Sequence, residues 1–339
     1  MSEQPRIRFR RGRLLRAGAA FAVLLALAGY LLLQYEGGGR PAPGCRVVSA
    51  AGDGATYEMS TEQAVNAATI SAVGTSRGMP ERAVTIALAT ALQESALRNI
   101  DHGDRDSLGL FQQRPSQGWG NTEQIMDPVY SAGKFYEHLD KIPGYSRLPL
   151  TVAAQRVQRS GFPQAYAKHE PDAALLAAAL TGRAAATLTC GTEPAREPGD
   201  PERVREALVR DFGEDVLPRA KSGDSGADSG ADSGADSDAD AKPGRDQARE
   251  QRRGQGGGAK GKAVSPTLRV PVSTAVSPRG RDGQRGWELA HWAVAHASAL
   301  RIERVSYAGR EWSAADPEHT WRKAAKGTGA DEVVLTTAQ

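Results

Sequence analysis

One stretch of the sequence, residues 219–263, limits most strongly how the rest of the chain can fold. It contains repeats of Asp, Ser, Gly and Ala from Asp224 to Asp236 and then a basic, glycine-rich run from Arg245 to Lys262. A segment with so few apolar side chains cannot bury a core, so we expect a disordered insertion here. The apolar residues must therefore fold on either side of it. The sequence predicts one domain over 45–193 and a small domain over 200–218 plus 264–339.

The N-terminal residues 1–36 predict a single transmembrane helix. Six arginines precede an uncharged apolar run, Ala17 to Leu33, which is near the short limit for a membrane span. A cleaved signal peptide is the alternative, because Ala26-Leu27-Ala28 has the small-x-small form, but Tyr30 to Leu33 extend the apolar run beyond it. We therefore expect a single-pass protein of the cell membrane. After a spacer at 37–44, the bulk of the chain would lie outside the cytoplasm.

The chain contains two cysteines, Cys45 and Cys190, at the two ends of the first predicted domain. Because disulfides persist in exported proteins, we expect a bridge in place of two free thiols. The chain-entropy model gives a loop of this length about 4–5 kcal/mol, as an upper value. No histidine lies close in sequence to either cysteine, so a metal site shared by them is not expected. No motif of the sequence indicates a cofactor or another metal site. The net charge of +3 gives no reason to expect nucleic-acid binding.

The first domain is predicted to be almost entirely α-helical, with no strand. Its clearest helix, Pro80 to Leu97, carries apolar residues at three- and four-residue steps, namely Val84, Ala87, Leu88 and Ala91. Glu94 falls on that same face. A carboxylate there is unfavourable unless it is paired or opens into a cleft, which makes Glu94 a candidate catalytic residue.

Caps and turns mark the other helices of this domain. A capping-box pattern, Ser60 to Gln63, opens a helix that ends near Gly74 or Gly78. Further helices are expected at Glu123–Ile125, after Asp127-Pro128, at Leu150–Val157 and from Asp172 to Leu180. The loop Asp101 to Asp106 holds three aspartates, but their spacing differs from that of an EF-hand, so a solvated loop at a cleft rim is expected instead of a calcium site.

A second motif follows Glu94-Ser95 after that polar loop. Gly109-Leu110-Phe111-Gln112 begins 15 residues beyond Glu94. In this order and spacing, the two motifs resemble the lysozyme-like lytic transglycosylases and goose-type lysozymes. That family has a Glu-Ser pair at a helix end and then a Gly-Leu-Met-Gln type loop, and Phe111 here replaces the methionine. The resemblance covers roughly Cys45 to Cys190.

The resemblance implies an enzyme that cleaves the glycan strands of peptidoglycan. Glu94 would act as acid and then as base, and the muramic acid 6-hydroxyl would attack to leave a 1,6-anhydro end. The implied substrate contacts are Ser95, Gly109, Leu110, Phe111, Gln112, Gln158, Ser160 and Tyr166. The last three replace the family's third motif, an Ala-Tyr-Asn-Ala-Gly type loop, which the sequence does not contain.

Two alternatives to this mechanism follow from the same residues. An aspartate of the loop 101–106 could reach the cleft and support hydrolysis instead of anhydro-ring formation. The domain could also be a catalytically inactive lysozyme-like module that binds wall glycan or scaffolds partner proteins. The intact Glu94 favours an enzyme, and the missing third motif favours the inactive module.

The C-terminal domain is predicted to be a small α/β unit. Its expected elements are a helix from Asp200-Pro201 to Gly213, strands at Thr267–Val276, Ile302–Tyr307 and Asp331–Leu335, and a helix at Trp287–Leu300. The stretch Gly286 to Trp312 resembles part of an accessory domain of bacterial cell-wall proteins that is distantly related to zinc D,D-peptidases. Because His291, His296 and His319 form no ligand motif, a structural or binding role is expected.

Overall fold

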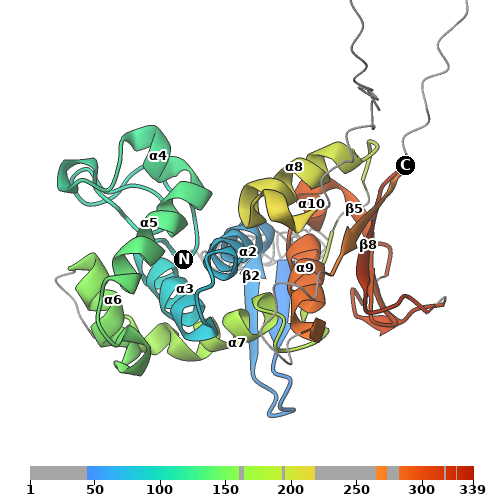
Figure 1. The fold of residues 1–339 in the computed structure, drawn as a ribbon, viewed down its shortest axis with the longest axis horizontal. Coiled ribbons are helices and arrows are strands. Elements are labelled where there is room, and N and C mark those ends of the chain that lie inside the picture. The colour runs from blue at the N-terminus through green and yellow to red at the C-terminus, as the bar shows by residue number, and fades with distance from the viewer. Residues whose placement is uncertain are drawn as a thin grey trace, which may run out of the picture. The chain divides into compact units, whose positions relative to one another are not determined.

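The protein is described here by a computed structural model that defines residues 44–159, 164–192, 195–217, 265–272, 282–316, 318–325 and 327–339 (Figure 1). The described residues up to Leu217 and from Pro266 onward form one compact unit. The predicted disordered insertion, 219–263, lies outside the described residues.

Six α-helices form most of the first part of the chain. They are α2 (Thr61–Ser76), α3 (Glu81–Ser95), α4 (Thr122–Met126), α5 (Pro128–Asp140), α6 (Leu150–Gln158) and α7 (Glu170–Leu180), with the short 3₁₀ helices η1 (Pro115–Gln117), η2 (Tyr145–Arg147) and η3 (Ala167–His169). The predicted capping box is confirmed, because Ser60 and Gln63 exchange both of its hydrogen bonds. The predicted start of the last helix is wrong. Asp172 lies inside the first turn of α7, where a negative charge is favourable.

The core of this part is built around α3. Its buried residues are Ala83 to Leu92 and Ser95, so burial extends around the helix and not along one face only. Helix α3 packs against α7 and α2. Alanines on α3 and α7 allow close helix packing because the distance between two helix axes depends on the side chains at the contact.

A small antiparallel sheet corrects the expectation of a strand-free domain. Its strands are β1 (Gly44–Val48), β2 (Thr56–Ser60) and β3 (Leu188–Cys190), in the order β2-β1-β3. The predicted disulfide is confirmed, since Cys45 lies directly opposite Cys190 in the β1–β3 pair and the two are bonded. The strands are short and β3 pairs with a strand far away in sequence, so their alternation was too weak to recognise.

The C-terminal part contains a second antiparallel sheet with helices beside it. Its strands are β4 (Thr267–Pro271), β5 (Ile302–Tyr307), β6 (Arg310–Ser313), β7 (Arg322–Lys323) and β8 (Glu332–Thr337), in the order β4-β8-β5-β6-β7. The helices are α8 (Pro201–Phe212), α9 (Asp282–Ala295) and α10 (Ala297–Leu300), with the 3₁₀ helix η4 (Glu214–Val216) after α8. The predicted helix Trp287–Leu300 is thus two helices that meet at His296.

A buried carboxylate joins helices from both parts of the chain. Asp211 of α8 accepts hydrogen bonds at Oδ2 from Thr69 of α2, at 2.9 Å, and from the indole of Trp292 in α9, at 2.8 Å. The Asp211 side chain is fully buried. Figure 1 shows α2, α8 and α9 close together, and these bonds fix their contact. Because a buried carboxylate is unfavourable without such partners, it favours one arrangement of the three helices.

Two predictions must be corrected: the N-terminal transmembrane helix in the fold class, and the localisation in the cell membrane that rested on it. No helix in the part of the chain that the structure describes is long and apolar enough to cross a membrane. The longest of these is α2, with 16 residues. It spans about 24 Å, short of the hydrocarbon thickness of about 30 Å. Residues 1–43, on which the single-pass prediction rested, lie outside the described residues.

His291 of α9 is held between two backbone groups. Its Nδ1 lies 2.8 Å from the carbonyl oxygen of Ala179, and its Nε2 lies 3.2 Å from the amide nitrogen of Thr187. Because a carbonyl only accepts and an amide only donates, the neutral ring carries its proton on Nδ1. Burial lowers the pKa of His291 to about 4, against a smaller opposing effect of the Ala179 carbonyl.

We expect the free energy of unfolding to fall as the pH drops from 6.5 towards 4. In that window the unfolded chain binds a proton at His291 that the folded chain excludes. The full loss is on the order of 3 kcal/mol. Urea denaturation at several pH values should show a shallower dependence in His291→Asn, which keeps a donor and an acceptor but does not titrate. Equal pH dependence in the two proteins would contradict this expectation.

Candidate functional site

Glu94 is the last residue but one of α3, and the turn that follows fixes its direction. Ala96 and Leu97 both adopt the left-handed conformation, with φ of +52° and +60°. Such a pair of non-glycine residues persists only where the surroundings hold it. Here the Leu97 amide donates to the Ala91 carbonyl, and the Asn66 side chain donates to the Leu97 carbonyl at 2.8 Å. The helix end that carries Glu94 is therefore rigid.

The Glu94 carboxyl is half-buried and bonded to a residue distant in sequence. The hydroxyl of Tyr166 donates to Glu94 Oε1 at 2.6 Å, and Tyr166 is itself fully buried. Burial raises the pKa of Glu94, while hydrogen bonds from Tyr166 and Gln158 lower it by less, so the net shift is upward. Glu94 thus keeps its proton to higher pH than an ordinary glutamate, as a general acid requires.

The glycine loop is tied to the same helix end. The hydroxyl of Ser95 donates to the Leu110 carbonyl at 2.8 Å, and the Gln158 amide donates to the Phe111 carbonyl at 2.6 Å. Gly109 has φ of +74°, and a Cβ there would lie 2.7 Å from the Ile125 carbonyl oxygen, so the position requires glycine. The structure therefore brings Glu94, the loop and Gln158 together.

The loop side chains make contacts within the protein. Leu110 and Phe111 are fully buried, and Phe111 stacks on Phe135 with the ring centres 4.7 Å apart. The amide nitrogen of Gln112 lies 3.3 Å from both the His102 and the Gly109 carbonyl oxygens. These three side chains make contacts that stabilise the loop, and its Leu110 and Phe111 carbonyls accept the bonds from Ser95 and Gln158. Ser160, the remaining predicted contact, lies outside the described residues.

The loop aspartates are engaged elsewhere or exposed. Asp106 accepts from the Ser116 amide at 2.8 Å and from Arg114 at 2.7 Å. Bonds from Ser116, and then from Arg114, hold the Asp106 pKa well below its usual range. The Asp101 and Asp104 side chains are 86% and 91% exposed. Glu94 is therefore the half-buried carboxyl of this site. No group of metal-binding side chains occurs in the ranges that the structure defines.

A second contact beside the Glu94–Tyr166 pair was missed in the sequence. His169 Nε2 lies 3.2 Å from Gln93 Oε1, so both pairs join the end of α3 to the segment that leads into α7. Burial lowers the His169 pKa, which favours the neutral ring. Tyr166 and His169 are three residues apart, a spacing that places two side chains on one face of a helical turn. The three-residue spacing of Tyr166 and His169 was the sequence signal that could have revealed this second contact.

Comparison with known proteins concerns the other part of the chain. A family model described as "VldE, C-terminal domain" matches residues 243–333. No curated protein matches the sequence. The matched range contains strand β4, helices α9 and α10 and strands β5 to β7, and it ends in β8. It does not extend to helix α3, which carries Glu94.

Replacing Tyr166 with Phe is expected to raise the pKa of Glu94 further. The Tyr166 hydroxyl donates to the carboxylate and so favours the charged form, and Phe keeps the ring without the donor. Carbon-detected NMR titration of the Glu94 carboxyl in both proteins measures the shift. Tyr145→Phe is the matched control, because it removes a tyrosine hydroxyl from η2 and leaves the bond between Tyr166 and Glu94 in place. A Glu94 pKa that stays the same or falls in Tyr166→Phe would contradict the assigned bond.

Proposed function

We propose that the helical part of this protein cleaves the glycan strands of peptidoglycan, with Glu94 as the catalytic acid. The observation that carries the proposal is the state of Glu94. It is a half-buried carboxyl with a raised pKa, at a rigid helix end beside a glycine loop. Cleavage of a glycosidic bond needs a proton at the leaving oxygen, and a carboxyl that holds its proton supplies one. The reaction class is that of a lytic transglycosylase or a muramidase.

The bonds around Glu94 suit both halves of such a reaction. Protonated Glu94 would give its proton to the leaving glycosidic oxygen as the bond to the muramic acid C1 breaks. The Glu94 carboxylate that remains accepts the Tyr166 hydrogen bond, which stabilises its charge. It would then remove the proton from the 6-hydroxyl that attacks C1, which closes the anhydro ring and restores the acid. This route needs one carboxyl, in agreement with the engagement of Asp106 by Arg114 and Ser116.

Digestion of purified sacculi by the full chain tests this function. Mass spectrometry of the released fragments should find 1,6-anhydromuramic acid ends. Reducing ends would keep Glu94 as the acid but make water the nucleophile, as in a muramidase. Absence of soluble fragments, with a protein whose circular dichroism shows it to be folded, would contradict the proposal.

The second candidate is a glycan-binding module without activity. It is favoured by the side-chain amides of Gln112 and Gln158, which bond to backbone carbonyls within the protein and leave fewer groups to orient a substrate. Cosedimentation with sacculi separates the two functions. An inactive module would bind sacculi and release no fragments, whereas the enzyme would release fragments in the same tubes.

A further inference from the structure

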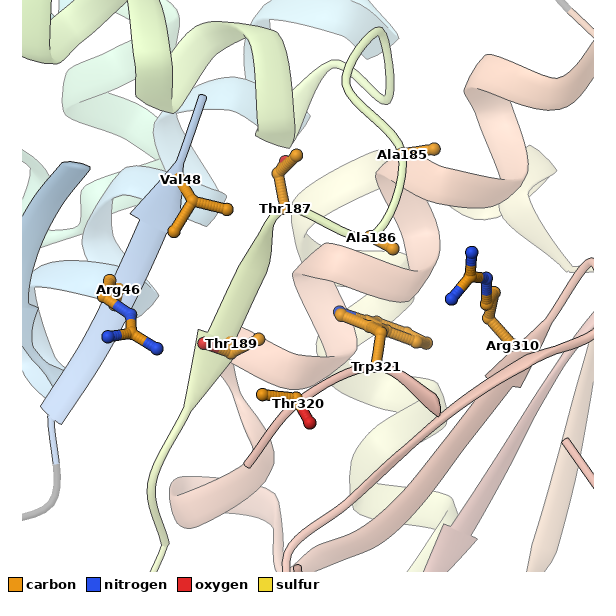
Figure 2. Close-up of a pocket in the computed structure, with 9 residues that line it drawn as sticks. All are labelled: Arg46, Val48, Ala185, Ala186, Thr187, Thr189, Arg310, Thr320 and Trp321. Carbon is orange, nitrogen blue, oxygen red and sulfur yellow. The ribbon is translucent and has the colours of Figure 1, made fainter. Parts of the chain in front are cut away.

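A pocket of about 320 Å³ lies apart from the Glu94 site, where the small sheet meets the C-terminal sheet (Figure 2). Its walls come from three segments: β1, the stretch from Ala185 into β3, and β6 with the loop that leads into β7. The lining residues are Arg46, Val48, Ala185, Ala186, Thr187, Thr189, Arg310, Thr320 and Trp321. The volume is at the lower end of the range for ligand sites and suits a molecule of monosaccharide size.

The wall of the pocket is held rigidly from behind. The indole nitrogen of Trp321 donates to the Leu188 carbonyl at 2.8 Å, and the ring stands edge-on to Trp287 with centres 5.2 Å apart. Thr187 is fixed as well, because its amide donates to His291 and its hydroxyl to the Ala184 carbonyl. A pocket with walls fixed in advance loses little conformational entropy when a ligand binds.

Two cations line this pocket without a partner of opposite charge. The guanidinium groups of Arg46 and Arg310 form no ion pair or hydrogen bond with any residue that the structure describes, whereas nearby Arg322 pairs with Asp316. In Figure 2 the two arginines lie on opposite sides of Trp321. A guanidinium group carries five donors in a planar fork, which match the oxygens of a carboxylate or a phosphate.

The residues that lie opposite the two arginines in neighbouring strands also affect the charge of this surface. Lys323 lies directly opposite Arg310 in the β6–β7 pair, and Thr189 lies opposite Arg46 in the β1–β3 pair. Glu58 is the opposing charge, since it faces Arg46 in the β1–β2 pair, but the two side chains form no ion pair. The charged side chains among the lining residues are Arg46 and Arg310, and these residues include no carboxylate, so the pocket attracts anions.

We propose that this pocket binds a small ligand that carries a carboxylate or a phosphate group. Arg46 or Arg310 binds the anionic group from its own side of Trp321, the hydroxyls of Thr189 and Thr320 hydrogen-bond to the ligand's polar groups, and the Trp321 ring forms its apolar wall. The site does not depend on the proposed cleavage of glycan strands. It would remain if Glu94 were inactive, and its failure would leave the role of Glu94 untouched.

Calorimetric titration of the full chain at low salt tests the proposal with three sugars of similar size. N-acetylmuramic acid carries a carboxylate, glucose 6-phosphate carries a phosphate, and neutral N-acetylglucosamine is the control. We expect one or both anionic sugars to bind and the neutral sugar to bind at least tenfold more weakly, as expected when charge-assisted hydrogen bonds are lost. Which anion binds identifies the source of the anionic group. Equal binding of all three, or binding of none, would overturn the proposal.

Matched arginine variants assign that binding to the pocket. At least one of the variants Arg46→Ala and Arg310→Ala is expected to weaken binding of the anionic sugar about tenfold. Arg203→Ala, on the exposed surface of α8, should bind as wild type does. Chemical-shift changes of the Trp321 indole N–H in the wild-type protein give a readout that needs no variant. Unchanged affinity in both pocket variants, or shifts that spare Trp321, would contradict the site.

Discussion

Replacing Glu94 with Gln is expected to slow the release of soluble fragments from peptidoglycan by about 10²–10⁴-fold, the usual contribution of a general acid. An amide cannot give a comparable proton to the leaving oxygen. It keeps the size of the side chain and still accepts the hydrogen bond of Tyr166, so the helix end should stay in place. Initial rates with equal amounts of both proteins measure the effect.

A control separates the role of Glu94 from a general loss of charge. Glu62→Gln removes an exposed glutamate from the first turn of α2 and should cut at the wild-type rate. Glu94→Gln should unfold at no lower urea concentration than wild type, since it removes a half-buried carboxyl. If Glu94→Gln cuts sacculi as fast as wild type, Glu94 is not the acid.

Removing the disulfide should have the largest effect on stability. The Cys45–Cys190 bridge closes a loop with a sequence separation of 145 and joins β1 to β3. Chain entropy alone gives about 5 kcal/mol for such a loop, and measured losses are typically about 2–5 kcal/mol. We therefore expect the paired replacement Cys45→Ala and Cys190→Ala to lower the free energy of unfolding by that amount.

Urea denaturation of the wild-type and paired-alanine proteins measures this loss. Alanine is used instead of serine because both cysteines are almost fully buried, and serine would bury a hydroxyl there. Reducing agent should destabilise the wild type to a similar degree and leave the alanine protein unchanged. A difference below about 1 kcal/mol between the oxidised wild type and the alanine protein would show that the bridge contributes little.

The helices could be predicted because their signals are local. The capping box of Ser60 and Gln63, the Asp127-Pro128 start of α5 and the apolar period of α3 each act within a few residues. The same locality placed Glu94 at a helix end before the glycine loop. Where the local signal was ambiguous, as at Asp172, the predicted boundary was wrong.

The parts that could not be predicted depend on residues far apart in sequence. Tyr166 reaches Glu94 across 72 residues, and Asp211 reaches Thr69 across 142. Strands β1 and β3 are short, and the cysteines that face each other in this pair are 145 residues apart in sequence, so neither strand shows a clear pattern of its own. Leu110 and Phe111 were predicted as substrate contacts from their motif, but burial assigns their side chains to the core.

The pH dependence of the cleavage rate tests most directly the central claim that protonated Glu94 is the catalytic acid. The rate should be high while Glu94 holds its proton. It should then fall as the pH rises through a Glu94 pKa above the ordinary value of 4.5. In Tyr166→Phe, which has lost the bond favouring the charged form, the fall should move to higher pH. A rate that stays constant between about pH 4 and pH 8, or a fall that does not move in Tyr166→Phe, would contradict the account.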